Sequence, residues 1–195
     1  MCVFPTAYFP SINYLKELYG CDQPTIELCE NFPKQTIRNR CEILTSNGVL
    51  TLSIPVIHNP IGKQQTKVVR IDYSKNWQID HWRAIQSAYA SSPYFEDYFE
   101  EIKSIITEKC DYLIQKNERI LNFINQLLER NLHITYTNQF ENQLAFKKNL
   151  FLERELNFSK TYQQVFSHNK PFTTNLSALD LIFNEGPFSR NWILT

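Results

Sequence analysis

Glycine is scarce in this 195-residue chain, and its scarcity excludes the commonest phosphate-binding loops. The chain has four glycines, Gly20, Gly48, Gly62 and Gly186. None of them forms the GxGxxG pattern of dinucleotide-binding folds or the GxxxxGK pattern of P-loops, in which glycine lets the backbone approach phosphate closely. A phosphate group bound by this protein would therefore have to be held by side chains.

An excess of charge of one sign is also missing. The 20 basic and 20 acidic residues give a formal net charge of zero. Because this balance provides no overall attraction for DNA or RNA, we expect no nucleic-acid partner.

No run of about 18 apolar residues predicts a membrane span. The N-terminus lacks the basic and apolar regions of a signal peptide, so we expect a cytoplasmic location.

Metal and hydrolase signatures are absent too. The four histidines show no HxH, HxxxH or HExxH spacing, and no GxSxG segment occurs, so we expect neither a helix-borne metal site nor a cofactor. The five cysteines form an odd set without CxxC spacing. We interpret them as reduced thiols that pack as small apolar residues. They are Cys2, Cys21, Cys29, Cys41 and Cys110.

Hydrophobic periodicity predicts an α+β protein in one domain, residues 1–195. The N-terminal third is β-rich, with Asn47-Gly48 as the turn of a hairpin, and the middle is helical. Ser92-Pro93 is typical of a helix N-terminus. A short C-terminal helix begins after Ser177, with Asp180 as its capping-box partner, and ends at Gly186. Expected helices cover 11–19, 77–90, a segment from 93 and 113–130; expected strands cover 25–32, 35–45, 49–57, 67–73 and 133–137.

The segment 35–45 carries the first candidate site. In a strand, Arg38 and Arg40 share one face, while Asn39 and Cys41 share the other. Two neighbouring guanidinium groups suit a carboxylate or a phosphate, because each guanidinium group can bind such an anion through paired hydrogen bonds. The alternative is a solvated strand face of alternating charge, which the spacing alone favours.

Two aromatic-rich helical segments carry further candidates. His81 could act as a general base, or it could be a partly buried structural histidine. Tyr94 begins an aromatic stripe that continues with Phe95, Tyr98 and Phe99. The stripe either packs in the core or presents a platform for a sugar ring.

The C-terminal part is rich in side-chain amides and hydroxyls among apolar residues. Gln164, Asn175 and Asp180 are its candidate substrate-binding residues, with Ser177 and Asn184 nearby. All of these side chains could instead serve as local caps and turns.

Five stretches, in order along almost the whole chain, resemble the WbqC-like family of bacterial proteins. They are PTAYFPSINY (5–14), KQTIRNRCEI (34–43), NGVLTLSIPV (47–56), residues 71–98 and NLSALDLIFNEGP (175–187). The family's NR-type motif falls on Arg38, Asn39 and Arg40, its helix histidine on His81, and its C-terminal motif on Asn175, Ser177, Asp180 and Asn184. The chain departs from many relatives at Phe4, where they have Gln.

The family takes its name from genes of O-antigen and surface-polysaccharide clusters, and the resemblance therefore implies a role in making or modifying sugars. The leading hypothesis is a transferase of a sugar, acyl or aminoacyl group acting on a small-molecule substrate. Arg38 and Arg40 would hold an anionic group, and His81 would be the base. The rival is a non-catalytic ligand-binding or scaffold protein. A third hypothesis pairs Cys41 with His81 in a papain-like arrangement.

Geometry separates these hypotheses. An enzyme predicts a deep cleft in which Arg38 or Arg40, His81 and polar residues of 162–184 converge on one ligand. A binding module predicts a shallow aromatic surface, with His81 packed away from it.

Overall fold

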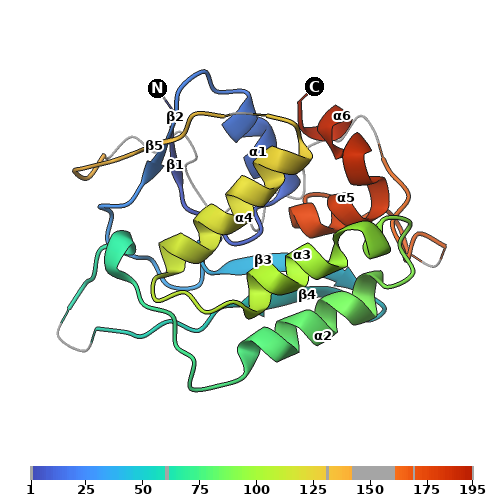
Figure 1. Ribbon diagram of the computed structural model, residues 1–195, viewed down its shortest axis with the longest axis horizontal. Helices are drawn as coiled ribbons and strands as arrows, with labels where there is room; N and C mark the ends of the chain where they lie inside the picture. The colour runs from blue at the N-terminus through green and yellow to red at the C-terminus, as the bar shows by residue number, and fades with distance from the viewer. Residues whose placement is uncertain (1, 60–61, 131, 142–160, 169, 195) are drawn as a thin grey trace.

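A three-stranded parallel sheet forms one part of the molecule (Figure 1). The computed structural model describes residues 2–59, 62–130, 132–141, 161–168 and 170–194. Strand β2 (Pro24–Glu27) lies between β1 (Cys2–Pro5) and β5 (Thr135–Tyr136). Parallel neighbours need a crossover connection, and helix α1 (Ile12–Tyr19) lies in the connection between β1 and β2. The Ser11 side chain accepts a hydrogen bond from the Tyr14 amide and caps this helix.

The predicted hairpin forms a separate two-stranded sheet. Strands β3 (Arg40–Thr45) and β4 (Gly48–Ser53) pair antiparallel, with Thr45 opposite Gly48. Gly48 has φ of 115°, a conformation that glycine adopts without the steric cost of a side chain. The Asn47-Gly48 signal therefore predicted the turn correctly.

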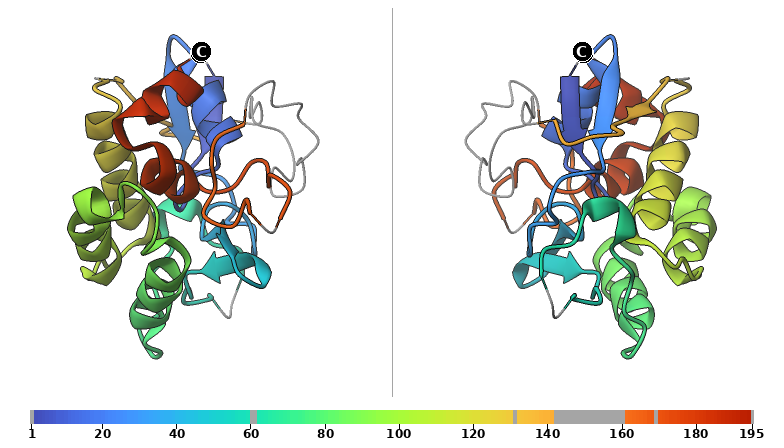
Figure 2. Two further views of the ribbon diagram at one scale, coloured as in Figure 1. Left: turned by 90° about the vertical axis from the view of Figure 1, so that its right-hand side faces the viewer. Right: turned by 90° about the vertical axis from the view of Figure 1, so that its left-hand side faces the viewer.

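The helical middle is also confirmed, and with it the α+β class. Figure 2 shows α3 and α4 side by side along one flank of the molecule. The 3₁₀ helix η1 covers Thr66–Val68, and the chain ends in α5, η2 and α6. The helices are α2 (Trp77–Tyr89), α3 (Phe95–Thr107), α4 (Leu113–Leu127), α5 (Ala178–Glu185) and α6 (Arg190–Ile193), with η2 at Gly186–Ser189.

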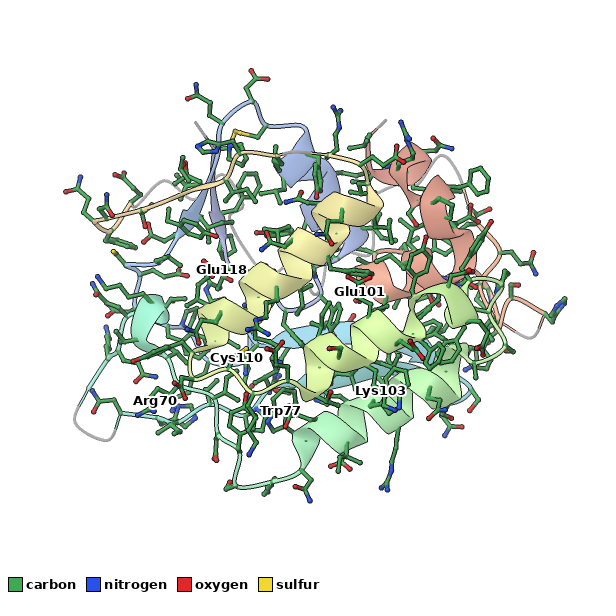
Figure 3. The ribbon with its side chains drawn as sticks, in the orientation of Figure 1. Arg70, Trp77, Glu101, Lys103, Cys110 and Glu118 are labelled. Atoms are coloured by element: carbon green, nitrogen blue, oxygen red, sulfur yellow. A yellow bond between two sulfur atoms is a disulfide. The ribbon has the colours of Figure 1, made fainter. Side chains whose placement is uncertain are left out.

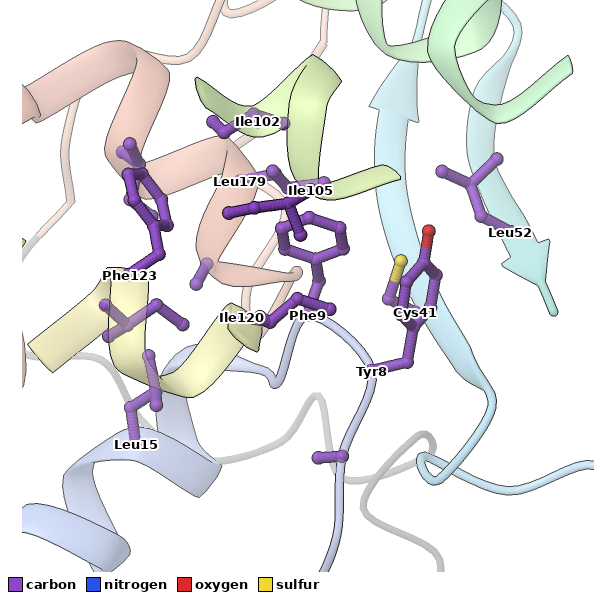
Figure 4. Packing of buried hydrophobic residues seen from close by; sticks show 14 of the residues in the cluster. Tyr8, Phe9, Leu15, Cys41, Leu52, Ile102, Ile105, Ile120, Phe123 and Leu179 are labelled. Atoms are coloured by element: carbon purple, nitrogen blue, oxygen red, sulfur yellow. The ribbon is translucent and has the colours of Figure 1, made fainter. Parts of the chain in front are cut away.

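The main core lies where the segments from both ends of the chain meet the central helices. Figure 4 shows side chains of α3, α4 and α5 packed around Phe9, with Cys41 of β3 beside Tyr8. Both Tyr8 and Phe9 are fully buried. Residues 6–11 run through this core without forming a helix or a strand, and their backbone is bonded to distant segments, since the Tyr8 amide donates to the Ile37 carbonyl and the Pro10 carbonyl accepts from the Ala178 amide.

Several predicted elements are wrong in position or extent, and the predicted strands 25–32 and 49–57 already end at Glu27 and Ser53. Residues 67–73 form the end of η1 and isolated bridges, because the amides of Thr66 and Lys67 donate to carbonyls of residues 30 and 28. The predicted strand 35–45 begins only at Arg40, since residues 37–39 form a turn in which the Asn39 amide donates to Thr36. Helix α3 begins at Phe95, and the hydroxyl of Ser92 donates back to the Tyr89 carbonyl.

The expectation of five reduced thiols is also wrong. Cys2 and Cys21 form a disulfide, while Cys29, Cys41 and Cys110 are free and buried. The crossover through α1 explains the pairing. This crossover returns the chain beside β1, where the Cys2 amide donates to the Gln23 carbonyl. Cys2 and Cys21 are therefore neighbours in space although 19 positions separate them in the sequence.

Candidate functional site

Three segments that are distant in sequence meet at one junction, and they are three of the stretches singled out in the sequence. The Ser177 amide donates to the Glu42 carbonyl at 2.9 Å, and the Ala178 amide donates to the Pro10 carbonyl at 2.8 Å. Ser11 and Ser177 also form an antiparallel bridge. Backbone hydrogen bonds therefore hold residues 9–12, strand β3 and the start of α5 together.

A small cavity lies at this junction, and we call it the Arg40 pocket. Its volume is about 20 Å³, which is enough for roughly one water molecule. It is lined by Phe9, Pro10, Ser11, Ile37, Arg40, Cys41, Glu42, Asn175 and Ser177. Arg40 and Asn175 are thus the two predicted substrate-binding residues that the fold brings together here.

The backbone of the Arg40 pocket is strained at two positions. Phe9 has φ of 37° and Asn175 has φ of 54°, both in the left-handed region that residues with a side chain rarely adopt. The Asn175 carboxamide oxygen accepts a hydrogen bond from the Asn13 amide, which helps to hold that conformation. Such strain concentrates at functional sites, where the surrounding structure maintains it.

Arg40 supplies the positive charge of the pocket. It is the first residue of β3, and its Nε donates to Ser53 Oγ at 3.3 Å. Among the described residues, its two terminal nitrogens have no hydrogen-bond partner. Glu42, two residues along the strand and on the same face, also lines the pocket. The pocket therefore combines a guanidinium group with a carboxylate.

The structure separates Arg38 from Arg40, contrary to the prediction that both share a strand face. Arg38 lies in the turn before β3, is buried, and binds Glu30 with two hydrogen bonds, one of 2.7 Å from Nη2 to Oε2. Its positive charge is therefore neutralised within the protein. The side-chain amide of Asn39 is buried as expected and donates to the Ile54 carbonyl at 2.9 Å.

His81 is packed inside the protein, and it does not line the Arg40 pocket. Its Nδ1 lies 2.9 Å from the hydroxyl of Tyr8, and the imidazole also hydrogen-bonds the Ser53 backbone. The ring of Trp77 packs edge-on against it. Burial lowers the pKa of His81 to about 4, so the imidazole is neutral near pH 7.

Cys41 lines the pocket but is not prepared to act as a nucleophile. Burial raises the pKa of its thiol well above the usual range, although a hydrogen bond from Ser177 opposes this effect. The thiolate is the reactive form of cysteine. The hydrogen bond of His81 goes to Tyr8, and Tyr8 lies beside Cys41. These contacts do not form the papain-like pair.

Gln164 and Asp180 form an internal network instead of lining the pocket. The Asp180 carboxylate accepts a hydrogen bond of 2.6 Å from the Tyr162 hydroxyl and one of 2.9 Å from the Gln164 side chain. Gln164 also exchanges two hydrogen bonds with the Thr173 backbone. Burial raises the pKa of Asp180. This network fastens Tyr162, Gln164 and Thr173 to α5.

Ser177 caps α5 as predicted, because its hydroxyl accepts from the Leu179 amide. The carboxylate of Asp180 is not its capping-box partner, since that carboxylate faces Tyr162 and Gln164.

Tyr94 precedes α3. Its amide donates to the Phe183 carbonyl, and its ring lies against Gly186. Tyr94 therefore has a packing role, away from the Arg40 pocket.

Two polar residues of the pocket, Ser11 and Glu42, were missed as site candidates. Ser11 stands at the start of a predicted helix, where the capping role accounts for a serine completely. Glu42 could have been selected from the sequence. It lies two residues after Arg40, and residues i and i+2 of a strand lie on the same face.

Within the described ranges, no group of three or more His, Cys, Asp or Glu side chains is arranged to hold a metal ion. The helices of the same ranges are all too short or too polar to cross a bilayer.

Comparison with known proteins places these features in a family. The chain is 26% identical over 125 residues to the Mycobacterium tuberculosis protein named "Uncharacterized protein Rv1507c". The match covers 64% of this chain and 54% of the relative, so it spans about half of that protein's length. No solved structure matches the chain. The model of the WbqC-like protein family matches residues 6–158, and the chain therefore belongs to the WbqC-like protein family.

Proposed function

We propose that the protein is a transferase of bacterial surface-polysaccharide biosynthesis, which moves a sugar, acyl or aminoacyl group from an activated donor. The observation that carries the proposal is the Arg40 pocket, where a guanidinium group without a partner for its terminal nitrogens among the described residues meets strained backbone from two other segments. Arg40 would bind the anionic group of the donor with paired hydrogen bonds.

The chemistry of transfer suits a fixed positive charge. When the acceptor attacks the donor, the bond between the transferred group and its leaving group breaks, and negative charge develops on the leaving oxygen or sulfur. A guanidinium group at that position stabilises the developing charge. The small cavity would hold a part of the donor, since its volume of about 20 Å³ is far below that of a complete sugar site.

The proton of the attacking acceptor needs a base, and we assign this role to Glu42. Its carboxylate lines the same pocket as Arg40, whereas His81 does not. His81 is instead buried, with hydrogen bonds to Tyr8 and to the Ser53 backbone. Glu42 would take the proton from the acceptor hydroxyl or amine as the new bond forms.

A non-catalytic ligand-binding role is the second candidate, and a specific observation favours it. The cysteine of the pocket is buried with a raised pKa, and the predicted base is packed away from the pocket. A protein with this pocket could bind an anionic ligand without turning it over. The two candidates share Arg40 as the binding residue and differ in the role of Glu42.

Titration calorimetry with uridine diphosphate and with inorganic pyrophosphate tests the binding step. We expect Arg40→Ala to weaken binding at least about tenfold, which corresponds to about 1.4 kcal/mol. Arg40→Lys should restore part of the affinity, because it keeps the charge but loses the paired geometry. Arg70→Ala is the matched control, since Arg70 is exposed and lies outside the pocket. Equal binding by wild type and Arg40→Ala would overturn the proposal.

Turnover separates the two candidates. Wild-type protein is incubated with a panel of uridine-diphosphate sugars and acyl-coenzyme A donors, and release of the leaving group is measured. For a transferase, Glu42→Gln should abolish release while the binding of uridine diphosphate persists. Binding through Arg40 without release from any donor would favour the non-catalytic role.

A further inference from the structure

A second cavity lies at the carboxyl ends of the parallel strands, beside α4. Thr6 and Ala7 directly follow β1, Ile26 belongs to β2 and Tyr136 to β5. Helix α4 contributes one face, since its lining residues are spaced at i, i+3, i+4 and i+7. They are Ile114, Asn117, Glu118 and Leu121, and the lining is completed by Pro10 and Tyr14. The carboxyl end of a parallel sheet is where open α/β folds bind their ligands.

Asn117 gives this cavity an unsatisfied hydrogen-bond acceptor. Its side-chain nitrogen donates to Thr6 Oγ1 and to the Arg38 carbonyl, both at 2.9 Å. A backbone carbonyl can only accept, so this contact fixes which end of the amide is nitrogen. The carboxamide oxygen is buried without a partner among the described residues, and Asn117 as a whole is 3% exposed. Such an oxygen is expected to find a donor.

Tyr136 forms an aromatic platform at the rim of the same cavity. Tyr136 as a residue is 40% exposed, and its hydroxyl is hydrogen-bonded to the Glu118 side chain. This bond holds the phenol hydroxyl in place while part of the residue remains open to solvent. An aromatic ring of this kind has the apolar surface against which the C–H face of a sugar packs.

The cavity adjoins a larger groove along α4. Glu118 lines both, and Figure 3 labels Glu118 on α4 and Cys110 in the segment just before that helix. The groove has a volume of about 470 Å³, within the range of small-molecule sites. Its lining is mostly polar or charged and consists of Tyr73, Lys109, Cys110, Asp111, Gln115, Glu118 and Arg119. The cavity itself, at about 10 Å³, has room for no more than one hydroxyl or water.

We propose that the cavity and the groove together bind a saccharide. One hydroxyl enters the cavity and donates to the Asn117 carboxamide oxygen, the sugar ring packs on Tyr136, and Glu118 accepts from a second hydroxyl. Pro10 lines both this cavity and the Arg40 pocket, so a single residue borders the two sites. The assignment of this saccharide as the acceptor of the transfer rests on the proposed function.

Saturation-transfer NMR with methyl glucoside and with the methyl glycoside of N-acetylglucosamine tests the site. We expect saturation transfer to at least one of them in the wild type. Affinity should fall at least about tenfold in Tyr136→Ala and in Glu118→Gln. Tyr112→Ala is the matched control, because Tyr112 is similarly exposed but lines neither the cavity nor the groove. Both site variants change side chains near the surface, so a loss of binding can be measured on folded protein.

The outcomes separate this inference from the proposed function. If neither glycoside receives saturation in the wild type, or if Tyr136→Ala binds as tightly as the wild type, the saccharide site is wrong, whatever uridine diphosphate does at Arg40. If a glycoside binds through Tyr136 while uridine diphosphate does not bind through Arg40, the saccharide site stands and the transferase function fails.

Discussion

The hydroxyl of Tyr8 and Nδ1 of His81 lie 2.9 Å apart, although 73 positions separate the two residues in the sequence. The same imidazole hydrogen-bonds the Ser53 backbone, so its partners come from the N-terminal segment and from the end of β4. This arrangement makes His81 a cross-link between two parts of the core. It also explains why a histidine stands on a buried helix face.

Protonation of His81 should destabilise the protein. Burial lowers its pKa from 6.5 to about 4, so the unfolded chain binds a proton at a higher pH than the folded protein does. The stability that neutral His81 contributes is complete above pH 6.5 and is lost as the pH falls toward 4. The full loss is about 3 kcal/mol. Urea unfolding at intervals from pH 7 to pH 4 measures it.

A histidine variant isolates this effect. The His81→Gln variant should be less stable than the wild type at pH 7. Its unfolding free energy should, however, fall much less than that of the wild type between pH 6.5 and pH 4. His133→Gln should keep the decline, because His133 is exposed. If the decline is the same in His81→Gln and in the wild type, another group causes it.

The buried pair of Glu30 and Arg38 should matter far more to stability than an exposed pair of the same residue types. Both side chains are less than 10% exposed, and two hydrogen bonds join them. Removing one partner leaves a buried charge unpaired, so Glu30→Gln should cost about 3–5 kcal/mol in urea unfolding. The matched control is Glu129→Gln, because Glu129 pairs with Arg190 at 2.8 Å on the surface and should contribute at most about 1 kcal/mol. Similar costs for both variants would contradict a structural role for Arg38.

The elements that were predicted correctly are those that local physics determines. The Asn47-Gly48 turn needs a residue that tolerates positive φ, and the helices α2 and α4 carry their apolar residues with helical spacing. The strand prediction for 67–73 was wrong. The β-branched residues of this segment suggested a strand, but backbone hydrogen bonds to residues 28 and 30 hold the start of the segment in the 3₁₀ helix η1. Strand β1 is too short at four residues to show a pattern of its own.

The candidate site was only partly predictable for a related reason. Arg40 and Asn175 could be selected as polar residues in unusual surroundings, but their meeting depends on contacts between segments more than 130 positions apart. The partner of Arg38 lies eight residues away across a loop, and no periodicity connects the two. The disulfide of Cys2 was hidden in the same way, since only the parallel pairing of β1 and β2 brings it to Cys21.

A side chain at position 186 should conflict with Tyr94. Gly186 has φ of 53°, and a Cβ atom there would lie 2.4 Å from the ring of Tyr94. Gly186→Ala should therefore destabilise the protein by at least about 1 kcal/mol, through backbone strain and steric overlap together. Thermal unfolding measures the loss. Gly62→Ala should change little, because the space around a Cβ at position 62 is open among the described residues.

The overlap can be separated from the strain. In a Tyr94→Ala background the ring is absent, so Gly186→Ala should cost less than it does in the wild type. An unchanged cost would mean that the backbone conformation alone determines the preference for glycine, and that Tyr94 does not pack against position 186 in solution.

The disulfide between Cys2 and Cys21 makes a prediction about both thiol content and stability. Protein unfolded without reductant should expose three titratable thiols, and five after reduction, because Cys29, Cys41 and Cys110 are free. The closed loop spans 19 positions, and opening it in the Cys2→Ser, Cys21→Ser double variant should cost about 3 kcal/mol of unfolding free energy. Five thiols in unreduced protein would contradict the bond. The Cys29→Ser control should lower the unreduced count to two, because this substitution removes one free thiol and leaves the disulfide intact.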